Sequence, residues 1–243
     1  SRLRAGALQQ VLGRPEDKPS HIRDIRARQR LGFNVLRCDP PRAAAEGPEG
    51  FCSLEYLLEH SQVVTMHVPL DSTTRGMADE TFFALMQPGS IFINASRGEV
   101  INEDALIAAA PKFGAVVIDT WCNEPNINEE LLEVADIATP HIAGYSYQGK
   151  ENATMMAVRA VAAFLGIDEL ADFTPVDSQE GHDPVLLDLK DKNNGEIAAV
   201  LQYNYPIFTD DFRLRMEPYK FEKLRAEYKY RVYYIVALSC QSS

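Results

Sequence analysis

The stretch "GSIFINASRGEVINEDALIAAAPKFGAVVID", residues 89–119, carries the pattern that decides the fold. Two short apolar runs, residues 89–96 and 114–119, flank a helical segment for which Asn102 is the predicted N-cap. A strand, a helix and a second strand joined by short links are typical of two parallel strands connected by a crossover helix.

The same alternation extends over residues 31–166. Apolar runs of strand length alternate with helical segments: we expect strands at 33–39, 62–70, 89–96, 114–119 and 136–142, and helices at 53–60, 78–86, 102–110, 128–135 and 148–166. This order predicts an α/β fold, a Rossmann-like doubly wound parallel sheet covered by helices on both faces. Ligands of such sheets bind at the carboxyl ends of the strands.

Residues 1–30 differ from the rest of the chain. They contain eight Lys/Arg and three Asp/Glu, although the whole chain has a net charge of −11. They also lack a continuous apolar run of the kind that buried parallel strands require. Residues 11–24, "VLGRPEDKPSHIRD", hold one glycine and two prolines where a glycine-rich phosphate loop is expected. We therefore expect an atypical basic segment, with the first strand and the glycine loop missing.

The C-terminal part of the chain predicts a second, smaller unit. Residues 167–182 are polar and acidic, as in a linker, and residues 183–243 combine strand and helix patterns. We expect strands at 184–190 and 232–238, and helices at 195–205 and 221–231. This part is therefore predicted to be a small α+β domain.

Composition limits the function classes. The net charge of −11 argues against nucleic acid and anionic membranes as partners, and no apolar run is long enough to span a bilayer. The four scattered cysteines are expected to be reduced thiols of a cytoplasmic protein: Cys38, Cys52, Cys122 and Cys240. We predict no metal site.

Polar residues follow several predicted strands, and each allows two interpretations. Asp39 could hold a ribose, or it could be an N-cap or turn residue before two prolines. Arg97 could grip a carboxylate with two parallel hydrogen bonds, although an arginine in such a loop is more often a surface residue. Asp119 and Glu124 could contact a nicotinamide and a histidine, or be ordinary loop acids.

His141 lies in "TPHIAG", at the end of the last predicted strand. A histidine suits proton transfer near neutral pH, but a lone histidine is more often structural. Arg97, Glu124 and His141 all fall at the same edge of the predicted sheet. A carboxylate clamp, an acid and an imidazole at one edge indicate a site for oxidation of a hydroxy acid.

Together these segments resemble the D-2-hydroxyacid dehydrogenase family, which carries an arginine after a strand, a D-x-W-x-x-E-P segment and a T-P-H-I-A-G segment. The resemblance implies catalysis by Arg97, Glu124 and His141 with NAD as cofactor. Residues 119–150, "DTWCNEPNINEELLEVADIATPHIAGYSYQGK", are similar to a branch that oxidises 4-phospho-D-erythronate, a phosphorylated 2-hydroxy acid, on the way to pyridoxal 5′-phosphate. That branch forms homodimers through its C-terminal domain. Relative to it, the chain is expected to be shortened at the N-terminus and in the dimerisation domain.

The resemblance also assigns roles to individual positions. Arg97 and Tyr145 are expected to bind the substrate, Tyr145 at its phosphate end. The positions expected to contact the cofactor are Asp39, Val68, Ala95, Ser96, Arg97, Asp119 and Gly144. A non-catalytic dimerisation or binding module on the same fold is the alternative, since the glycine loop is absent from the expected place.

Overall fold

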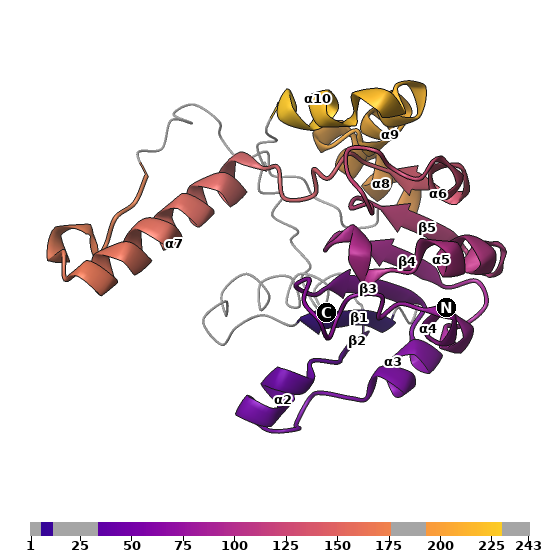
Figure 1. The fold of residues 1–243 in the computed structure, drawn as a ribbon, viewed down its shortest axis with the longest axis horizontal. Helices are drawn as coiled ribbons and strands as arrows, with labels where there is room; N and C mark the ends of the chain where they lie inside the picture. Colours follow the sequence, from indigo (N-terminus) through magenta and orange to yellow (C-terminus); the bar gives the residue numbers. More distant parts are fainter. Residues whose placement is uncertain (1–5, 12–33, 176–192, 230–243) are drawn as a thin grey trace. The chain divides into compact units, whose positions relative to one another are not determined.

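The computed structural model describes residues 6–11, 34–175 and 193–229. Six parallel strands form one sheet in the order β2-β1-β3-β4-β5-β6 (Figure 1). The strands are β1 (Gly6–Val11), β2 (Asn34–Arg37), β3 (Val63–His67), β4 (Ile91–Asn94), β5 (Ala115–Ile118) and β6 (Ile137–Ala138). The predicted α/β class with a parallel sheet is confirmed, and the first five strands follow the 2-1-3-4-5 order of doubly wound folds.

The expectation that no strand precedes residue 31 is wrong. β1 pairs in parallel with β2 on one side and β3 on the other, so that Leu8 lies opposite both Leu36 and Val64. Without this strand, the backbone groups of β2 and β3 would form two exposed edges. The sequence rule failed because it required an apolar run, whereas backbone pairing with a strand on each side is what makes β1 an interior strand of the sheet. The predicted loss of the glycine loop falls on residues 12–33, outside the described residues.

The helices of the sheet begin where side-chain caps are available. These are α2 (Pro40–Glu46), α3 (Leu54–His60), α4 (Glu80–Leu85), α5 (Glu103–Ala109) and α6 (Glu129–Val134). At the start of each helix, the side-chain oxygen of the N-cap residue accepts a backbone N–H of the first turn. In the order of the helices, these N-cap residues are Asp39, Ser53, Asp79, Asn102 and Asn128. Helix α2 was not predicted, although an N-cap role of Asp39 before the two prolines was one of the two interpretations of that residue. Proline is favoured at the first helical position.

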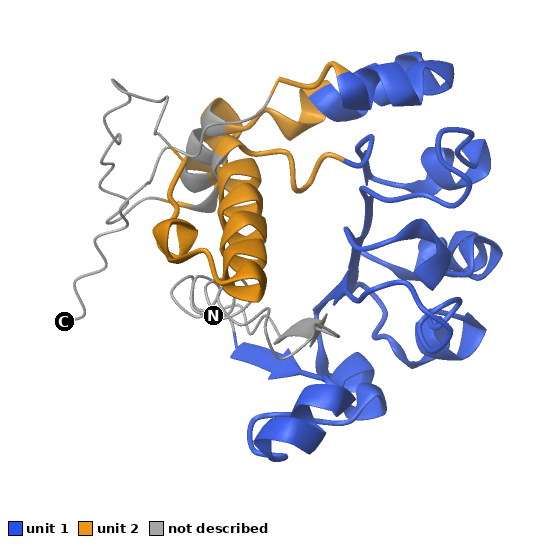
Figure 2. Ribbon diagram, turned by 60° about the vertical axis from the view of Figure 1, so that its left-hand side comes forward, with its two compact units in different colours: residues 1–141, 210–226 blue, residues 142–209, 227–243 orange. Residues whose placement is uncertain are grey.

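Helices α3 to α6 lie side by side in a row along one face of the sheet (Figures 1 and 2). The core between helices and sheet is aromatic at its centre. The Phe83 ring meets Phe92 of β4 edge to face, with centroids 5.2 Å apart, and Phe82 lies beside both. Leu57, Phe92 and Leu106 are completely buried. This packing fixes the carboxyl ends of the strands, where the candidate site residues lie.

Two helices from the C-terminal part of the chain pack at the edge of the sheet. They are α9 (Ile207–Met216) and α10 (Phe221–Ala226), joined by the 3₁₀ helix η4 (Pro218–Lys220). Asp211 accepts the Ala138 N–H of the edge strand β6 at 2.7 Å and pairs with Arg215 at 3.0 Å. Arg215 in turn donates to the Leu132 and Ala135 carbonyls at the end of α6. Leu214 and Phe221 are buried in the core. Charge-assisted hydrogen bonds and apolar burial thus attach residues 210–226 to the edge of the sheet.

The chain forms two compact units (Figure 2). The first comprises residues 1–141 and 210–226, and the second comprises residues 142–209 and 227–243. The second unit contains α7 (Tyr147–Leu165), the 3₁₀ helix η3 (Asp168–Leu170) and α8 (Asn194–Asn204). The helices expected at 148–166 and 195–205 are therefore present. The strands expected at 184–190 and 232–238 lie outside the described residues.

Helix α7 is bounded by standard signals at both ends. The Ser146 side chain accepts the Gly149 N–H at 3.0 Å, and Gly166 ends the helix in the left-handed conformation with φ 68°. Arg159 ties the helix to the segment that follows η3 by donating to the Phe173 carbonyl at 2.9 Å. None of the helices in the described part of the chain has the length and apolar character needed to cross a membrane.

Candidate active site

The loop after β4 presents Arg97. Asn94, buried at the end of the strand, accepts hydrogen bonds from the N–H and hydroxyl of Ser96 and donates to the Arg97 carbonyl at 2.9 Å. These bonds hold the main chain of Ala95 and Ser96 in a tight turn. The Arg97 side chain is exposed, with Nη1 donating to the Ser96 carbonyl at 2.7 Å. The guanidinium is therefore aimed by the turn and still accessible to a ligand.

Gly98 lets this loop meet the loop after β5. A Cβ atom at Gly98 would lie 1.9 Å from the Trp121 carbonyl carbon and 2.3 Å from the Cys122 nitrogen. Only glycine fits such a close approach of two backbones. Cys122 is fixed from the same direction, because its N–H donates to Glu103 at 2.9 Å. Arg97 and the Glu124 loop are consequently held next to each other at the sheet edge.

A polar network joins the ends of β5 and β6. The Thr139 hydroxyl donates to the buried Asp119 carboxylate at 2.6 Å, and the Trp121 ring N–H donates to the Thr139 carbonyl at 2.9 Å. The main-chain N–H of His141 donates to the Asp119 carbonyl at 2.8 Å. Trp121 is a packing residue, as expected from its type, and also positions the strand that leads to His141.

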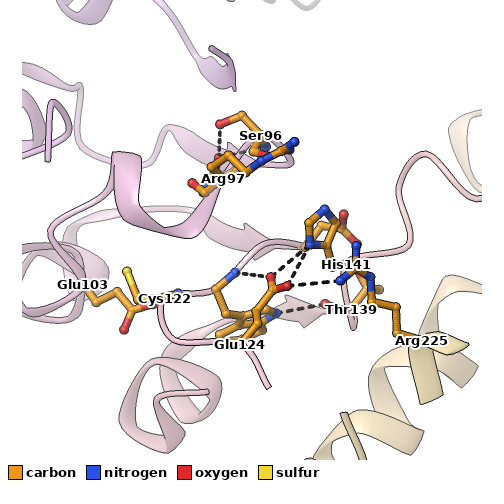
Figure 3. A network of polar contacts seen from close by, with 11 residues as sticks. Ser96, Arg97, Glu103, Cys122, Glu124, Thr139, His141 and Arg225 are labelled. Atoms are coloured by element: carbon orange, nitrogen blue, oxygen red, sulfur yellow. Dashed lines mark hydrogen bonds and ion pairs between the residues drawn. The ribbon is translucent and has the colours of Figure 1, made fainter. Parts of the chain in front are cut away.

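Glu124 and His141 form a hydrogen-bonded pair (Figure 3). The His141 Nδ1 atom lies 2.8 Å from Oε2 and 3.1 Å from Oε1 of Glu124. A carboxylate facing Nδ1 fixes the tautomer with Nδ1–H donating, which leaves the Nε2 lone pair for proton transfer. His141 has a left-handed backbone, φ 56°, which is uncommon for a residue with a side chain and is typical of functional sites.

The Glu124 carboxylate has two further partners. The Trp121 main-chain N–H donates to Oε1 at 3.0 Å, and Arg225 Nη1 of α10 lies 3.6 Å from Oε2 (Figure 3). Burial raises the pKa of the Glu124 carboxyl, but the His141 and Trp121 hydrogen bonds and the charges of His141 and Arg225 outweigh it and lower the pKa. Glu124 is thus held as a carboxylate.

A cavity of about 620 Å³ lies at the carboxyl end of β2. Its wall includes Asp39, Pro40, Phe51, Thr73 and Met77. Asp39 is buried and caps α2, with Oδ1 accepting the N–H of Arg42, the third residue of the helix. The capping interpretation of this residue is therefore correct, and it leaves the carboxylate on the cavity wall.

Three of the four cysteines lie in the described residues, and all three are free thiols, as predicted. Burial, with smaller contributions from Cys52, Glu55 and Asp39, raises the pKa of Cys38 to about 11. Burial and Glu103 raise the pKa of Cys122 to about 12. Both groups therefore stay protonated near neutral pH. Cys240 lies outside the described residues.

The other predicted positions fall in two places. Val68 is buried directly after β3, at the same edge of the sheet as Arg97. Gly144 and Tyr145 belong to the second unit, where the Tyr145 ring meets Tyr228 edge to face and lies 4.3 Å from Lys150 Nζ. Sequence reasoning missed Arg225. It lies 101 residues after Glu124, and no local pattern connects the two.

Residues 24–143 match the family model described as the D-isomer specific 2-hydroxyacid dehydrogenase NAD-binding domain. Through these residues, the chain belongs to the D-isomer specific 2-hydroxyacid dehydrogenase family. The matched range contains all the described strands of the sheet except β1, together with Arg97, Glu124 and His141. The resemblance noted from the sequence motifs is thereby confirmed.

Two curated relatives of this dehydrogenase family are named erythronate-4-phosphate dehydrogenase. The protein from Bacteroides thetaiotaomicron is 41% identical over 209 residues, which cover 84% of this chain and 58% of the relative. The protein from Ectopseudomonas mendocina is 45% identical over 141 residues, which cover 57% of this chain and 37% of the relative. The chain thus covers 58% of the length of the first relative and 37% of the length of the second.

Solved structures of the dehydrogenase family share the fold. D-lactate dehydrogenase from Aquifex aeolicus, complexed with NAD and lactic acid, superposes with a TM-score of 0.54 at 29% identity, covering 68% of this chain and 55% of that one. The apo form of D-mandelate dehydrogenase from Rhodotorula graminis gives a TM-score of 0.51 at 34% identity, covering 61% and 45%. Their names give D-lactate and D-mandelate as the compounds on which they act.

Proposed function

We propose that this chain carries the NAD-binding and proton-transfer part of an erythronate-4-phosphate dehydrogenase. The reaction is the NAD-dependent oxidation of 4-phospho-D-erythronate to 2-oxo-3-hydroxy-4-phosphobutanoate, in the biosynthesis of pyridoxal 5′-phosphate (vitamin B6). The observation that carries the proposal is the Glu124–His141 pair, 2.8 Å apart, at the sheet edge that also presents the exposed Arg97. The names of the relatives supply the substrate class.

The described residues fit the adenosine end of NAD. The cavity after β2 has an apolar wall, which suits an adenine ring, and the Asp39 carboxylate can accept hydrogen bonds from ribose hydroxyls. A carboxylate in this position favours NAD over NADP, because the 2′-phosphate of NADP would meet a negative charge. Arg42, 3.9 Å from Asp39, is engaged with Glu46 at 2.9 Å.

In the proposed mechanism, each polar residue at the edge has one task. Arg97 binds the substrate carboxylate with two parallel hydrogen bonds and polarises the neighbouring carbon. His141 Nε2 takes the proton of the 2-hydroxyl group, and Glu124 accepts the Nδ1–H and stabilises the charged imidazole. Bound NAD supplies the hydride acceptor. In the reverse direction, His141 returns the proton.

The remaining assignments belong to the same proposal. Tyr145 contacts the phosphate end of the substrate. The cofactor contacts are those of Asp39, Val68, Ala95, Ser96, Arg97, Asp119 and Gly144. We further propose that residues 31–166 act as the cofactor-binding domain and that residues 183–243, of which 210–226 pack against the sheet, supply the dimerisation surface after the linker at 167–182. The working protein is a cytoplasmic homodimer.

The test combines binding and turnover. NAD is titrated into the purified protein by calorimetry, and NADH formation is followed with 4-phospho-D-erythronate, D-glycerate and D-lactate. We expect NAD to bind and the phosphorylated acid to be selected. Replacement His141→Asn is expected to lower kcat by a factor of roughly 10² to 10⁴ and to leave NAD affinity unchanged. Asparagine is chosen because it tolerates the left-handed backbone of His141.

His60→Asn is the matched control, since His60 is exposed on α3 and hydrogen bonds to the Tyr56 carbonyl of its own helix. It should leave kcat and NAD affinity unchanged. Absence of binding heat at millimolar NAD would contradict the proposal, as would equal turnover of lactate and the phosphorylated acid.

A further inference from the structure

Arg225 comes from α10, far along the chain from the residues it meets. Its Nη1 atom lies 3.6 Å from Oε2 of Glu124, the oxygen that is 2.8 Å from His141 Nδ1 (Figure 3). The side chains of Arg225 and Glu124 are 36% and 19% exposed. The carboxylate thus lies between two nitrogen groups, one on the acid/base histidine and one on a C-terminal helix.

Helix α10 is held firmly enough to place this arginine. The segment that precedes it is fixed by Asp211 on the β6 edge and by Arg215 on the end of α6. Phe221, the first residue of α10, is 1% exposed. Most ion pairs on protein surfaces contribute little because two long side chains must be ordered. Here the carboxylate is already ordered by Trp121 and His141, so only the Arg225 side chain has to be ordered to form the pair.

We propose that Arg225 is a positioning residue that orients the Glu124 carboxylate and sets the proton affinity of the Glu124–His141 pair. The inference rests on the function proposed above. Arg225 does not touch the reacting atoms and acts through Glu124. With His141 neutral, Glu124 and Arg225 together carry no net charge. Without Arg225, Glu124 and neutral His141 together carry one negative charge, so the Glu124–His141 pair holds an added proton more tightly.

The consequence concerns the direction of the reaction. Oxidation of the hydroxy acid needs an unprotonated Nε2 to accept the hydroxyl proton. A second cation on Glu124 makes this form available at lower pH. The charged residues on the three elements that meet at the pair are Asp119 and Glu124 after β5, Arg97 after β4, and Glu222, Lys223 and Arg225 on α10. All except Arg225 stay constant in the comparison that tests the proposal.

The first measurement needs neither cofactor nor turnover. The carboxyl ¹³C resonance of Glu124, assigned by its loss in Glu124→Gln, is titrated with pH in the wild type and in Arg225→Gln. We expect the pKa of Glu124 to rise by roughly 0.5 pH unit in Arg225→Gln, because one neighbouring positive charge is removed. Arg225→Lys, which keeps the charge, should restore at least half of this shift.

Arg213→Gln is the matched control: Arg213 is 63% exposed on α9 and pairs with Asp210, so the same charge is removed elsewhere. It should leave the Glu124 titration unchanged. If Arg225→Gln does not fold, Arg225→Met, which keeps the packing of the stem, takes its place. An unshifted Glu124 titration in the folded variant overturns the proposal, and so does an equal shift in Arg213→Gln.

The second measurement links the pair to turnover. The acidic limb of the kcat/KM profile for oxidation should move to higher pH by a similar amount in Arg225→Gln, and back in Arg225→Lys. A uniform loss of kcat/KM at all pH values, without a displaced limb, would mean that Arg225 is merely structural. Failure of the proposed function would instead remove turnover from the wild type and leave the NMR titration readable.

Discussion

The Glu124 side chain accepts hydrogen bonds from Trp121 and His141 and lies 3.6 Å from Arg225. Its carboxylate form is therefore stabilised by the folded structure and not by the unfolded chain. Because the pKa of Glu124 is lowered from its ordinary value of 4.5 on folding, protonation must work against the native state. The Glu124 carboxylate therefore contributes fully to the free energy of unfolding at pH values above its pKa in the unfolded chain. This contribution is lost as the pH falls through its pKa in the folded protein.

This sign gives a prediction for Glu124→Gln. The free energy of unfolding of the variant should be lower than that of the wild type by an amount that is largest above pH 4.5 and shrinks at more acidic pH. Urea unfolding at a series of pH values measures the difference. The control is Glu133→Gln, an exposed position on α6. A difference that stays constant or grows on acidification would show that Glu124 is not stabilised as a carboxylate.

The sequence was sufficient to predict that Arg97, Glu124 and His141 lie at one edge of the sheet, because each follows a strand within six residues in a motif with recognisable neighbours. Their roles stay predictions. The sequence was insufficient for Arg225, since a contact between residues 101 apart depends on how α9 and α10 return to the sheet. The structure also reveals the tasks of Asn94 and Gly98. Sequence spacing gives a turn there but not the backbone contact that the turn makes with Trp121.

At the scale of elements, the loops after β4 and β5 touch through Gly98. Replacement Gly98→Ala would place a methyl group within 2.3 Å of backbone atoms of Trp121 and Cys122. Since neither backbone can move without disturbing a strand end, we expect the free energy of unfolding to fall by about 1–3 kcal/mol. Chemical denaturation measures this change.

Gly144→Ala provides the comparison, because no atom lies within 4 Å of a Cβ built at Gly144. Its stability should stay within roughly 0.5 kcal/mol of the wild type. Equal stabilities for the two alanine variants would show that the two loops do not need the close approach.

The attachment of α9 to the edge strand gives a second prediction at this scale. Asp211→Ala removes the acceptor of the Ala138 N–H and the partner of Arg215. We expect a loss of about 2–4 kcal/mol in unfolding free energy, since a partly buried arginine and a strand N–H both lose a partner. Glu222→Ala, at an exposed position of α10, should have little effect. A loss no larger than that of the control would mean that α9 is held by apolar contacts alone.

Two elements show why local patterns miss parts of the fold. The segment 207–216, which forms α9, mixes aromatic and charged residues without a clear apolar stripe, and its partners lie on α6 and β6, over 70 residues away. β1, "GALQQV", has two glutamines and still lies inside the sheet, paired with β2 on one side and β3 on the other. In both, long-range pairing decides the structure. By contrast, strands β3 to β5 follow directly from their apolar runs.

At the scale of the whole molecule, cofactor binding should stabilise the protein. A ligand that binds only the folded chain, at 100 times its dissociation constant, adds about 2.7 kcal/mol, which raises Tm by roughly 5–11 °C for a chain of this size. We expect this shift with NAD in a thermal melt. NADP at the same concentration should give a smaller shift, because its 2′-phosphate meets the Asp39 carboxylate. Equal shifts would remove the ribose role from Asp39.

The first unit is discontinuous in the sequence, so the ribosome makes its two parts at different times. Residues 210–226 belong to it, although the second unit intervenes in the chain. After His141, the ribosome has to add 84 further residues before Arg225 is in place. At about 5–20 residues per second this is a delay of roughly 4–17 seconds. Until α9 has been made, the edge strand β6 of the nascent chain lacks the Asp211 acceptor of its Ala138 N–H, and an unpaired strand edge of this kind is prone to pair with other chains.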